Sequence, residues 1–205
     1  MFYDCDGIYV VDGLVPQKHQ DFLEDIIFNK SEVPFYFNST TNGIRKNNNP
    51  ELILNWGTFD PAQFTHIIIN ENVYISDWGQ EIVEPFLEFF NEFYECDDYD
   101  IFRCKINLST QTPKTRKIIE PHVDSQQKLW SVVYFVNTVP DSFLLLGKQT
   151  FNGKVQKKFK VSRRIESKKG RAVFFDSRRF HSAGKCPKNY SRSVINFVIG
   201  KYEDL

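Results

Sequence analysis

The chain has 205 residues, a length that fits one ordinary domain of ~100–250 residues, and we expect that domain to span 1–205. Its 26 Lys and Arg residues balance 26 Asp and Glu residues, so the formal net charge is zero. This balance argues against a nucleic-acid binder, which needs a basic field to displace phosphate counterions. Aromatic residues make up 16% of the chain, whereas Ala occurs only three times. Because aromatic side chains favour strands and Ala favours helices, the composition predicts a mainly β or mixed α+β fold.

The sequence has no pattern typical of membrane insertion or secretion. No apolar run approaches the ~20 residues that cross a bilayer, and the first residues lack the basic-then-apolar order of a signal peptide. The four cysteines, at positions 5, 96, 104 and 186, are far apart and form no C-x-x-C pair. We therefore expect a protein of the reducing cytoplasm with no membrane partner.

We interpret residues 1–100 as a support region of strands and helices. A short strand is expected at 7–12, and Pro16 suits the first turn of a helix over 17–29, where its missing N–H is not needed. Residues 38–50 are polar and rich in Asn, which predicts a loop. Two interpretations of this loop stay open, a lid over a site and a plain solvent-exposed connection. From 78 to 94, apolar residues recur every three or four positions, which predicts a helix packed on a sheet.

From residue 101 the apolar residues follow a period of two. In 101–108 they alternate with Arg103, Lys105 and Asn107, as in a strand with one packed face and one polar face. Further strands are expected at 129–137, 143–151, 155–165, 171–176 and 192–201. Short strands with regular turn signals indicate a sandwich or barrel. We expect 101–205 to form a double-stranded β-helix (jelly roll), with the N-terminal helices packed on one of its sheets.

The histidines include a candidate metal site. His122 and Asp124 are two residues apart, so a strand would point both at the same place. His181 follows the strand predicted at 171–176, where a neighbouring strand can bring it alongside. Two histidines and one carboxylate on one face leave three octahedral positions open, which is the facial triad of non-haem Fe(II) oxygenases. We interpret His19 as a surface residue and His66 as a structural one.

Arg192 is a candidate binding residue for a dicarboxylate. It begins a predicted strand, eleven residues after His181. A planar guanidinium can hold a carboxylate through two parallel hydrogen bonds, which an ammonium does less well. For Arg192 taken alone, a simple surface cation is the open alternative.

Several ordered motifs together resemble a known family. They are PHVD at 121–124, YFVN at 134–137, LLLGKQTF at 144–151, GRAVFFD at 170–176 and RSVINF at 192–197. Over about 102–199 the chain resembles the Fe(II)- and 2-oxoglutarate-dependent dioxygenases, in particular their small prolyl-4-hydroxylase-like members, some of them phage-encoded. The resemblance implies that His122, Asp124 and His181 bind Fe(II) and that Arg192 binds the distal carboxylate of 2-oxoglutarate, and it implies that these four residues are catalytic.

The chain also departs from this family. The family often has Tyr-Leu-Asn where this chain has Phe135-Val136-Asn137, so Phe135 takes the position of the tyrosine that usually touches the cosubstrate. A period of two then turns Tyr134 to the opposite face. Asn107 and Asn196 are candidates for the missing hydrogen bonds to the cosubstrate. The family's Gly-Gly-x-Thr segment is reduced to Gly147.

The resemblance implies an enzyme that hydroxylates an unactivated C–H bond and releases succinate and CO2. Its cosubstrates would be 2-oxoglutarate and O2, with ascorbate as a candidate reductant. The substrate would be a peptidyl proline or another protein side chain, and a free amino acid or other small molecule is the alternative. A phage-encoded member would act in the host cytoplasm. Two classes of another kind stay open, a cupin-like metal-binding module and a zinc hydrolase, because two histidines, a carboxylate and water also form a catalytic zinc site.

Other basic and aromatic residues have alternative interpretations. The stretch 154–171 interleaves Lys and Arg with apolar residues, which favours a solvated hairpin face over an attraction for acidic peptides or nucleic acid. Arg178 and Arg179 are candidates for steering an anionic substrate. Trp56 and Trp130 are candidates for lining an entrance or for core packing.

Overall fold

The computed structural model describes residues 3–4, 6–38, 62–94, 98–111, 121–153 and 159–201. In these ranges the fold is mainly β, as the composition predicted. The elements in chain order are β1 (Tyr3–Asp4), β2 (Ile8–Asp12), α1 (Gln17–Glu24), a π-helical turn (Asp25–Asn29), β3 (Tyr36–Asn38), β4 (Gln63–Asn70), β5 (Val73–Tyr74), α2 (Gly79–Tyr94), β6 (Asp100–Ser109), β7 (Trp130–Phe135), β8 (Phe143–Thr150), β9 (Val161–Glu166), β10 (Arg171–Asp176), β11 (Arg179–Ala183) and β12 (Arg192–Gly200).

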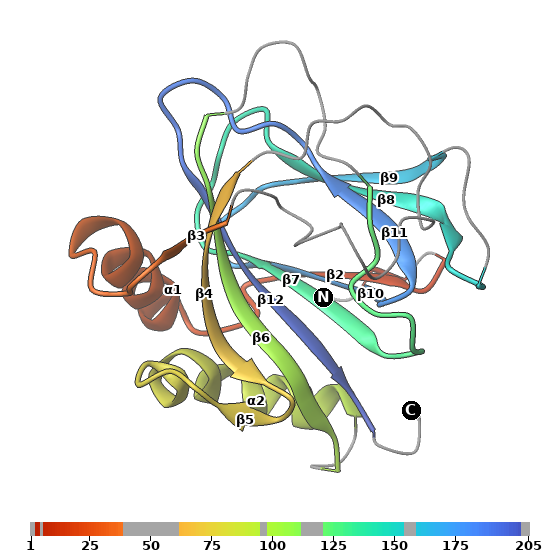
Figure 1. Cartoon of the computed structure of the whole chain (residues 1–205), viewed down its shortest axis with the longest axis horizontal. Helices are drawn as coiled ribbons and strands as arrows, with labels where there is room; N and C mark the ends of the chain where they lie inside the picture. Colours follow the sequence, from red (N-terminus) through yellow and green to blue (C-terminus); the bar gives the residue numbers. More distant parts are fainter. Residues whose placement is uncertain are drawn as a thin grey trace.

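The strands form two antiparallel sheets. The large sheet has the order β1-β2-β10-β7-β12-β6-β4-β3, with β5 paired to β4, and the small sheet has the order β11-β8-β9. Both helices lie on one side of the large sheet and the small sheet lies on the other (Figure 1). This arrangement confirms the predicted jelly roll with helices packed on one sheet. In the described part of the chain, no helix has the length and apolar character that a membrane crossing requires.

Most predicted elements occur where the sequence placed them. The helix predicted over 17–29 is α-helical to Glu24 and then continues as a π-helical turn, and the helix predicted over 78–94 is α2. The strand predicted at 155–165 is described only from β9 onward. The loop predicted at 38–50 lies outside the described residues from position 39, and so does Trp56.

Five of the described strands escaped prediction: the short strands β1, β3 and β5, and the longer strands β4 and β11. In β4 the register shifts between Ile67 and Ile69, so two neighbouring isoleucines, Ile68 and Ile69, are both buried and the period of two is broken. In β11 a similar shift lies between Arg179 and His181. A bulge of this kind adds one residue to a strand and hides its alternation from sequence analysis.

The alternation of β7 and β12 divides the core into two parts. Tyr134 packs against the helices, with its ring 4.9 Å from that of Phe86, while Phe135 belongs to the cluster between the two sheets. On β12, Ile195 and Phe197 face the helices in the same way. The opposite faces of Tyr134 and Phe135 confirm the strand register predicted from Asn137.

Trp130 and two histidines have packing roles. Trp130 packs edge to face against Tyr9 beside the helices, which favours the alternative of core packing. His66 is structural, as predicted, because its ring nitrogens bond to the Pro34 carbonyl and the Ser76 hydroxyl. The surface position predicted for His19 is wrong, since its half-buried ring stacks on Phe22 and burial lowers its pKa. The helical pattern predicts on which face of α1 His19 lies, but it does not show that a second helix, α2, covers that face.

Much of the basic charge after β9 is neutralised within the protein. Lys168 and Arg171 both pair with Asp12, at 2.7 and 2.6 Å, and Lys169 pairs with Glu24 of α1. Arg164 lies 4.1 Å above the Phe143 ring. These contacts agree with the predicted solvated face of a hairpin.

Replacing Asp12 by Asn should lower the free energy of unfolding at pH 7 by about 1 kcal/mol or less, because these ion pairs are exposed to solvent and screened. The hydrogen bond from Arg171, opposed by burial and assisted by Lys168, lowers the pKa of Asp12 to about 2. A folded-state pKa below the unfolded value of about 3.9 stabilises the protein above pH 4, and this stabilisation is lost as the pH falls towards 2. Urea unfolding of both proteins at pH 7 and pH 2.5 measures the difference, which should shrink at the lower pH. The exposed turn variant Asp141→Asn is the control, and an equal gap at both pH values would contradict the assignment.

Candidate metal centre

The two candidate histidine ligands are held opposite each other by the backbone. The His122 N–H donates to the His181 carbonyl at 2.9 Å, and the His181 N–H donates back to the His122 carbonyl at 2.8 Å. This exchange is the hydrogen-bonded pair of an antiparallel ladder, in which both side chains leave from the same face. The imidazole rings lie 4.4 Å apart between centroids. A one-residue bridge between the two segments therefore brings together residues 59 positions apart, 181 minus 122.

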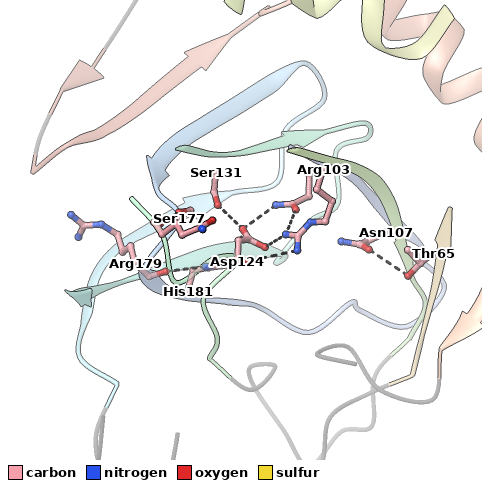
Figure 2. Close-up of polar contacts among 10 residues, drawn as sticks. Thr65, Arg103, Asn107, Asp124, Ser131, Ser177, Arg179 and His181 are labelled. Carbon is pink, nitrogen blue, oxygen red and sulfur yellow. Dashed lines mark hydrogen bonds and ion pairs between the residues drawn. The ribbon is translucent and has the colours of Figure 1, made fainter. Parts of the chain in front are cut away.

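Asp124 is fixed by donors from three strands. Its Oδ1 accepts a hydrogen bond from Arg103 of β6 at 2.7 Å. Its Oδ2 accepts from Ser131 of β7 at 2.7 Å and from Asn196 of β12 at 3.1 Å. Figure 2 shows the carboxylate between Ser131 and Arg103, with His181 close by. The orientation of this candidate ligand is thus set before any metal binds.

The charges around Asp124 keep it ionised. Burial by itself would raise its pKa, but His181, Arg103 and His122 together hold the pKa well below its usual range. His181 Nδ1 lies 3.1 Å from the Arg179 carbonyl, and since a carbonyl only accepts, Nδ1 carries the proton. The other ring nitrogen, Nε2, lies 3.5 Å from Asp124 Oδ2 and is the atom left to coordinate a metal. A carboxylate, and an imidazole nitrogen that has given up its proton, are the forms in which these side chains bind a metal.

These three side chains fit a metal ion. One ligand atom from each of His122, Asp124 and His181 lies within 4.8 Å of the others. Two imidazoles and one carboxylate are the donor set of the facial triad that binds non-haem Fe(II). The structure thus brings together all three residues that the sequence analysis proposed as ligands.

Arg192 lies in the same pocket as the three candidate ligands. The pocket has a volume of about 70 Å³ and lies between the two sheets, with Phe135 and Val194 in its wall. Arg192 is only 4% exposed, and its Nη1 donates to the Ser142 hydroxyl at 2.9 Å and to the Gly184 carbonyl at 2.8 Å. Burial lowers its pKa to about 10, so the guanidinium stays charged at neutral pH. The alternative of a simple surface cation is therefore wrong.

The other predicted cosubstrate contacts also line the pocket, and their binding role stays a prediction. Asn107 lies beside Thr65, whose hydroxyl is 3.5 Å from its Oδ1. Asn196 is already bonded to Asp124, and its Oδ1 accepts from Arg103 at 3.0 Å. Asn196 therefore orients a candidate metal ligand in addition to lining the pocket.

Both arginines proposed to steer a substrate are engaged in structural contacts. Arg178 forms a two-point ion pair with Asp176, and Arg179 donates to the backbone carbonyls of Gly147 and Asp6. Gly147 itself stands where β8 meets β11, since a Cβ there would come within 2.9 Å of the Phe180 carbonyl. The glycine retained from the family's segment therefore has a packing reason.

The sequence analysis did not identify several polar residues of the site, among them Arg103, Ser131 and Lys105. Arg103 and Ser131 hold Asp124, and Lys105 lines the pocket. The signal available was the polar face of β6, on which Arg103, Lys105 and Asn107 alternate with apolar residues. That face was recognised, but its partner at Asp124 depends on tertiary structure.

Comparison with known proteins supports the fold at low sequence identity. No family model and no curated protein sequence matches the chain. Among solved structures, a 2OG-Fe(II) oxygenase family oxidoreductase from Burkholderia pseudomallei is 12% identical, with a TM-score of 0.66 over 95% of this chain and 85% of that one. A Trichoplax adhaerens prolyl hydroxylase in complex with a hypoxia inducible factor peptide fragment is 14% identical, with a TM-score of 0.60 over 97% and 86%. The epimerase SnoN, in complex with Fe3+, alpha ketoglutarate and nogalamycin RO, is 12% identical, with a TM-score of 0.60 over 96% and 79%. The chain has the fold of the 2OG-Fe(II) oxygenases.

Replacing His122 or His181 by Ala should weaken binding of Mn(II), a stand-in for Fe(II), by more than about 100-fold, because each removes a ligand. Ser131→Ala should cost about 10-fold, since it only loosens Asp124. Calorimetric titration of the full chain measures all three affinities. His19→Gln, which alters a histidine outside the site, is the control. Unchanged affinity in both alanine variants at the ligand positions would remove them as ligands.

Proposed function

We propose that the protein is an Fe(II)- and 2-oxoglutarate-dependent dioxygenase that hydroxylates an unactivated C–H bond. The observation that carries the proposal is the common pocket of Arg192 and the three candidate ligands His122, Asp124 and His181. A metal triad that leaves open positions can accept a chelating cosubstrate and O2. Arg192 supplies the cation for the other end of that cosubstrate.

The residues of the chain would orient and protect the reacting groups. Hydrogen bonds to Ser142 and Gly184 hold the Arg192 guanidinium in place, so a distal carboxylate meets a preset partner. Phe135 and Val194 give the pocket apolar walls, which limit water around the reaction. With 2-oxoglutarate and O2, Fe(II) held by His122, Asp124 and His181 would supply the oxidative decarboxylation that releases succinate and CO2 and hydroxylates the substrate.

The two competing classes have less support. A zinc hydrolase needs a general base beside its metal-bound water, but Asp124 is the only carboxylate among the described residues of the pocket wall, and it is a candidate ligand. A module with a purely structural metal has no need of a buried, charged Arg192. The oxygenase accounts for both the ligands and the arginine.

For the substrate, our proposal is a peptidyl proline or another protein side chain. The support is the likeness to prolyl hydroxylases, one of them in complex with a peptide fragment. A free amino acid or other small molecule is the second candidate, and a cation in the pocket discussed below favours it. Cys104 and Cys186 are buried thiols that form no disulfide with another described residue, which accords with a reducing cytoplasm as the place of action.

The reaction class is tested by anaerobic titration of the protein with Fe(II) and 2-oxoglutarate, followed by a succinate assay in air. We expect a weak visible charge-transfer band that needs both additions, and succinate that depends on both. Hydrolysis of test esters by the zinc-loaded protein, with no response to 2-oxoglutarate, would overturn the proposal in favour of a hydrolase.

Arg192→Met should weaken 2-oxoglutarate binding to the Mn(II)-loaded protein by about 10- to 100-fold, the range expected when a charged hydrogen-bonding partner worth about 1.5–3 kcal/mol is lost. Arg163→Met, which removes an arginine from β9 outside the pocket wall, should bind as the wild type does. Isothermal titration gives both dissociation constants. An unchanged constant in Arg192→Met would mean that another residue anchors the cosubstrate.

Phe135→Tyr should fold normally and tighten 2-oxoglutarate binding severalfold, because Phe135 lines the pocket and a hydroxyl there can donate to the cosubstrate. Tyr134→Phe is the matched control, since Tyr134 faces the helices and should leave cosubstrate affinity unchanged. The same titration measures both variants. Loss of the folded state in Phe135→Tyr would contradict the position of this side chain in the pocket wall.

A further inference from the structure

Lys105 is a pocket residue for which the proposed reaction has no use. It lies on β6, opposite Asn196 of β12 on one side and Ile67 of β4 on the other. Its side chain lines the pocket that contains the three candidate metal ligands. In the described part of the chain, no side-chain hydrogen bond or ion pair involves Lys105, in contrast to Arg103 on the same face.

An ammonium in a pocket wall with no partner among the described side chains is unusual. Lys105 has intermediate exposure as a residue, as expected of a side chain that runs along a cavity wall. Burial, followed by repulsion from Arg103 and opposed by attraction to Asp124, lowers its pKa to about 8. The amine therefore remains largely protonated at neutral pH. Because an isolated buried charge destabilises a fold, buried cations usually have a partner.

The charges of the proposed complex leave Lys105 without that partner. Arg103 neutralises Asp124 directly, at 2.7 Å. The two negative charges of 2-oxoglutarate would equal the two positive charges of Fe(II), which leaves Arg192 and Lys105 in excess. If Arg192 takes the distal carboxylate, the excess moves to the metal end, where Lys105 lies. Whichever of the two cations, Arg192 or Lys105, binds the distal carboxylate of 2-oxoglutarate, the pocket keeps a net positive charge and attracts another anion.

The position of Lys105 distinguishes it from the cosubstrate anchor. Arg192 and Asn196 are four residues apart on β12, about 13 Å along an extended strand, and Lys105 is in register with Asn196. Asn196 bonds to Asp124, so Lys105 stands beside the metal end of the pocket. Its other neighbour, Ile67, is 44% exposed, so Lys105 lies between the metal site and a solvent-exposed residue of β4.

We propose that Lys105 binds a carboxylate of the primary substrate and so selects substrates that carry an anionic group close to the carbon that is hydroxylated. The proposal rests on the proposed oxygenase function and names its substrate class. A free amino acid, or an acidic residue of a peptide, meets this requirement. An internal proline with neutral neighbours does not, because it would leave the ammonium unpaired.

The test compares formate with formamide, two probes of nearly equal size that differ in charge. The full chain is loaded with Mn(II) and 2-oxoglutarate, and its melting temperature (Tm) is measured as each probe is added. For the wild type, formate should raise the Tm by about 2–4 °C, and formamide should not. In Lys105→Met the formate effect should disappear. Any formate that binds the metal itself acts equally on both proteins, so the difference reports on Lys105.

Three further measurements control for folding and for the cosubstrate. Lys105→Met without a probe should melt a few degrees higher than the wild type, because an unpaired buried charge has been removed. Lys105→Arg should retain the formate effect, and the exposed-lysine variant Lys188→Met should behave as the wild type does. The dissociation constant of 2-oxoglutarate should change by less than about threefold in Lys105→Met.

Two results would overturn the assignment of Lys105. One is a formate effect that is as large in Lys105→Met as in the wild type. The other is a loss of 2-oxoglutarate affinity in Lys105→Met as large as that in Arg192→Met, which would give Lys105 to the cosubstrate. Failure of the proposed function is a separate result, because then the wild type itself would not bind 2-oxoglutarate.

Discussion

The candidate site depends on the backbone pair between His122 and His181. Two hydrogen bonds, of 2.9 and 2.8 Å, join a segment that belongs to no strand to β11 of the small sheet. Because directly opposed residues of an antiparallel pair project to the same face, this contact determines that both imidazoles meet. A shift of one residue on either side would turn one ring away from the pocket.

The large sheet contributes the other side of the site. Its inner face carries polar side chains at alternate positions of β6 and β12, whereas the outer face packs apolar residues against α1 and α2. Asp124 receives hydrogen bonds from Arg103, Ser131 and Asn196, which compensate for the loss of water around a buried carboxylate. The helices therefore matter to the site indirectly, since they cover one face of the sheet and leave the other free for function.

Positive charge distinguishes this pocket from an ordinary core. Arg192 and Lys105 face a space whose only described carboxylate is Asp124, and Arg103 already neutralises that group. A protein that buries such charge without a partner loses stability. The excess positive charge therefore indicates that the pocket binds anions, one at Arg192 and, as we propose, another at Lys105.

Sequence analysis could identify residues whose role follows from local spacing. The two-residue spacing of His122 and Asp124, the alternation in 101–108 and the opposite faces of Tyr134 and Phe135 were all predicted because a strand has a period of two. Elements with a bulge, β4 and β11, were missed because an extra residue interrupts that period. His19 was misplaced because its environment is made by a helix some 60 residues further along the chain.

By itself, the sequence determined the mainly β class of the protein, the order of its principal strands and the residue types of the candidate metal site, because these follow from local periodicity and from the chemistry of side chains. Only the tertiary structure decided that Arg192 is buried beside the histidines, that Arg103 pairs with Asp124 and that Lys105 has no ion pair within the described ranges. Contacts of this kind join strands far apart in the chain, and their formation depends on sheet order and register, which no local pattern encodes.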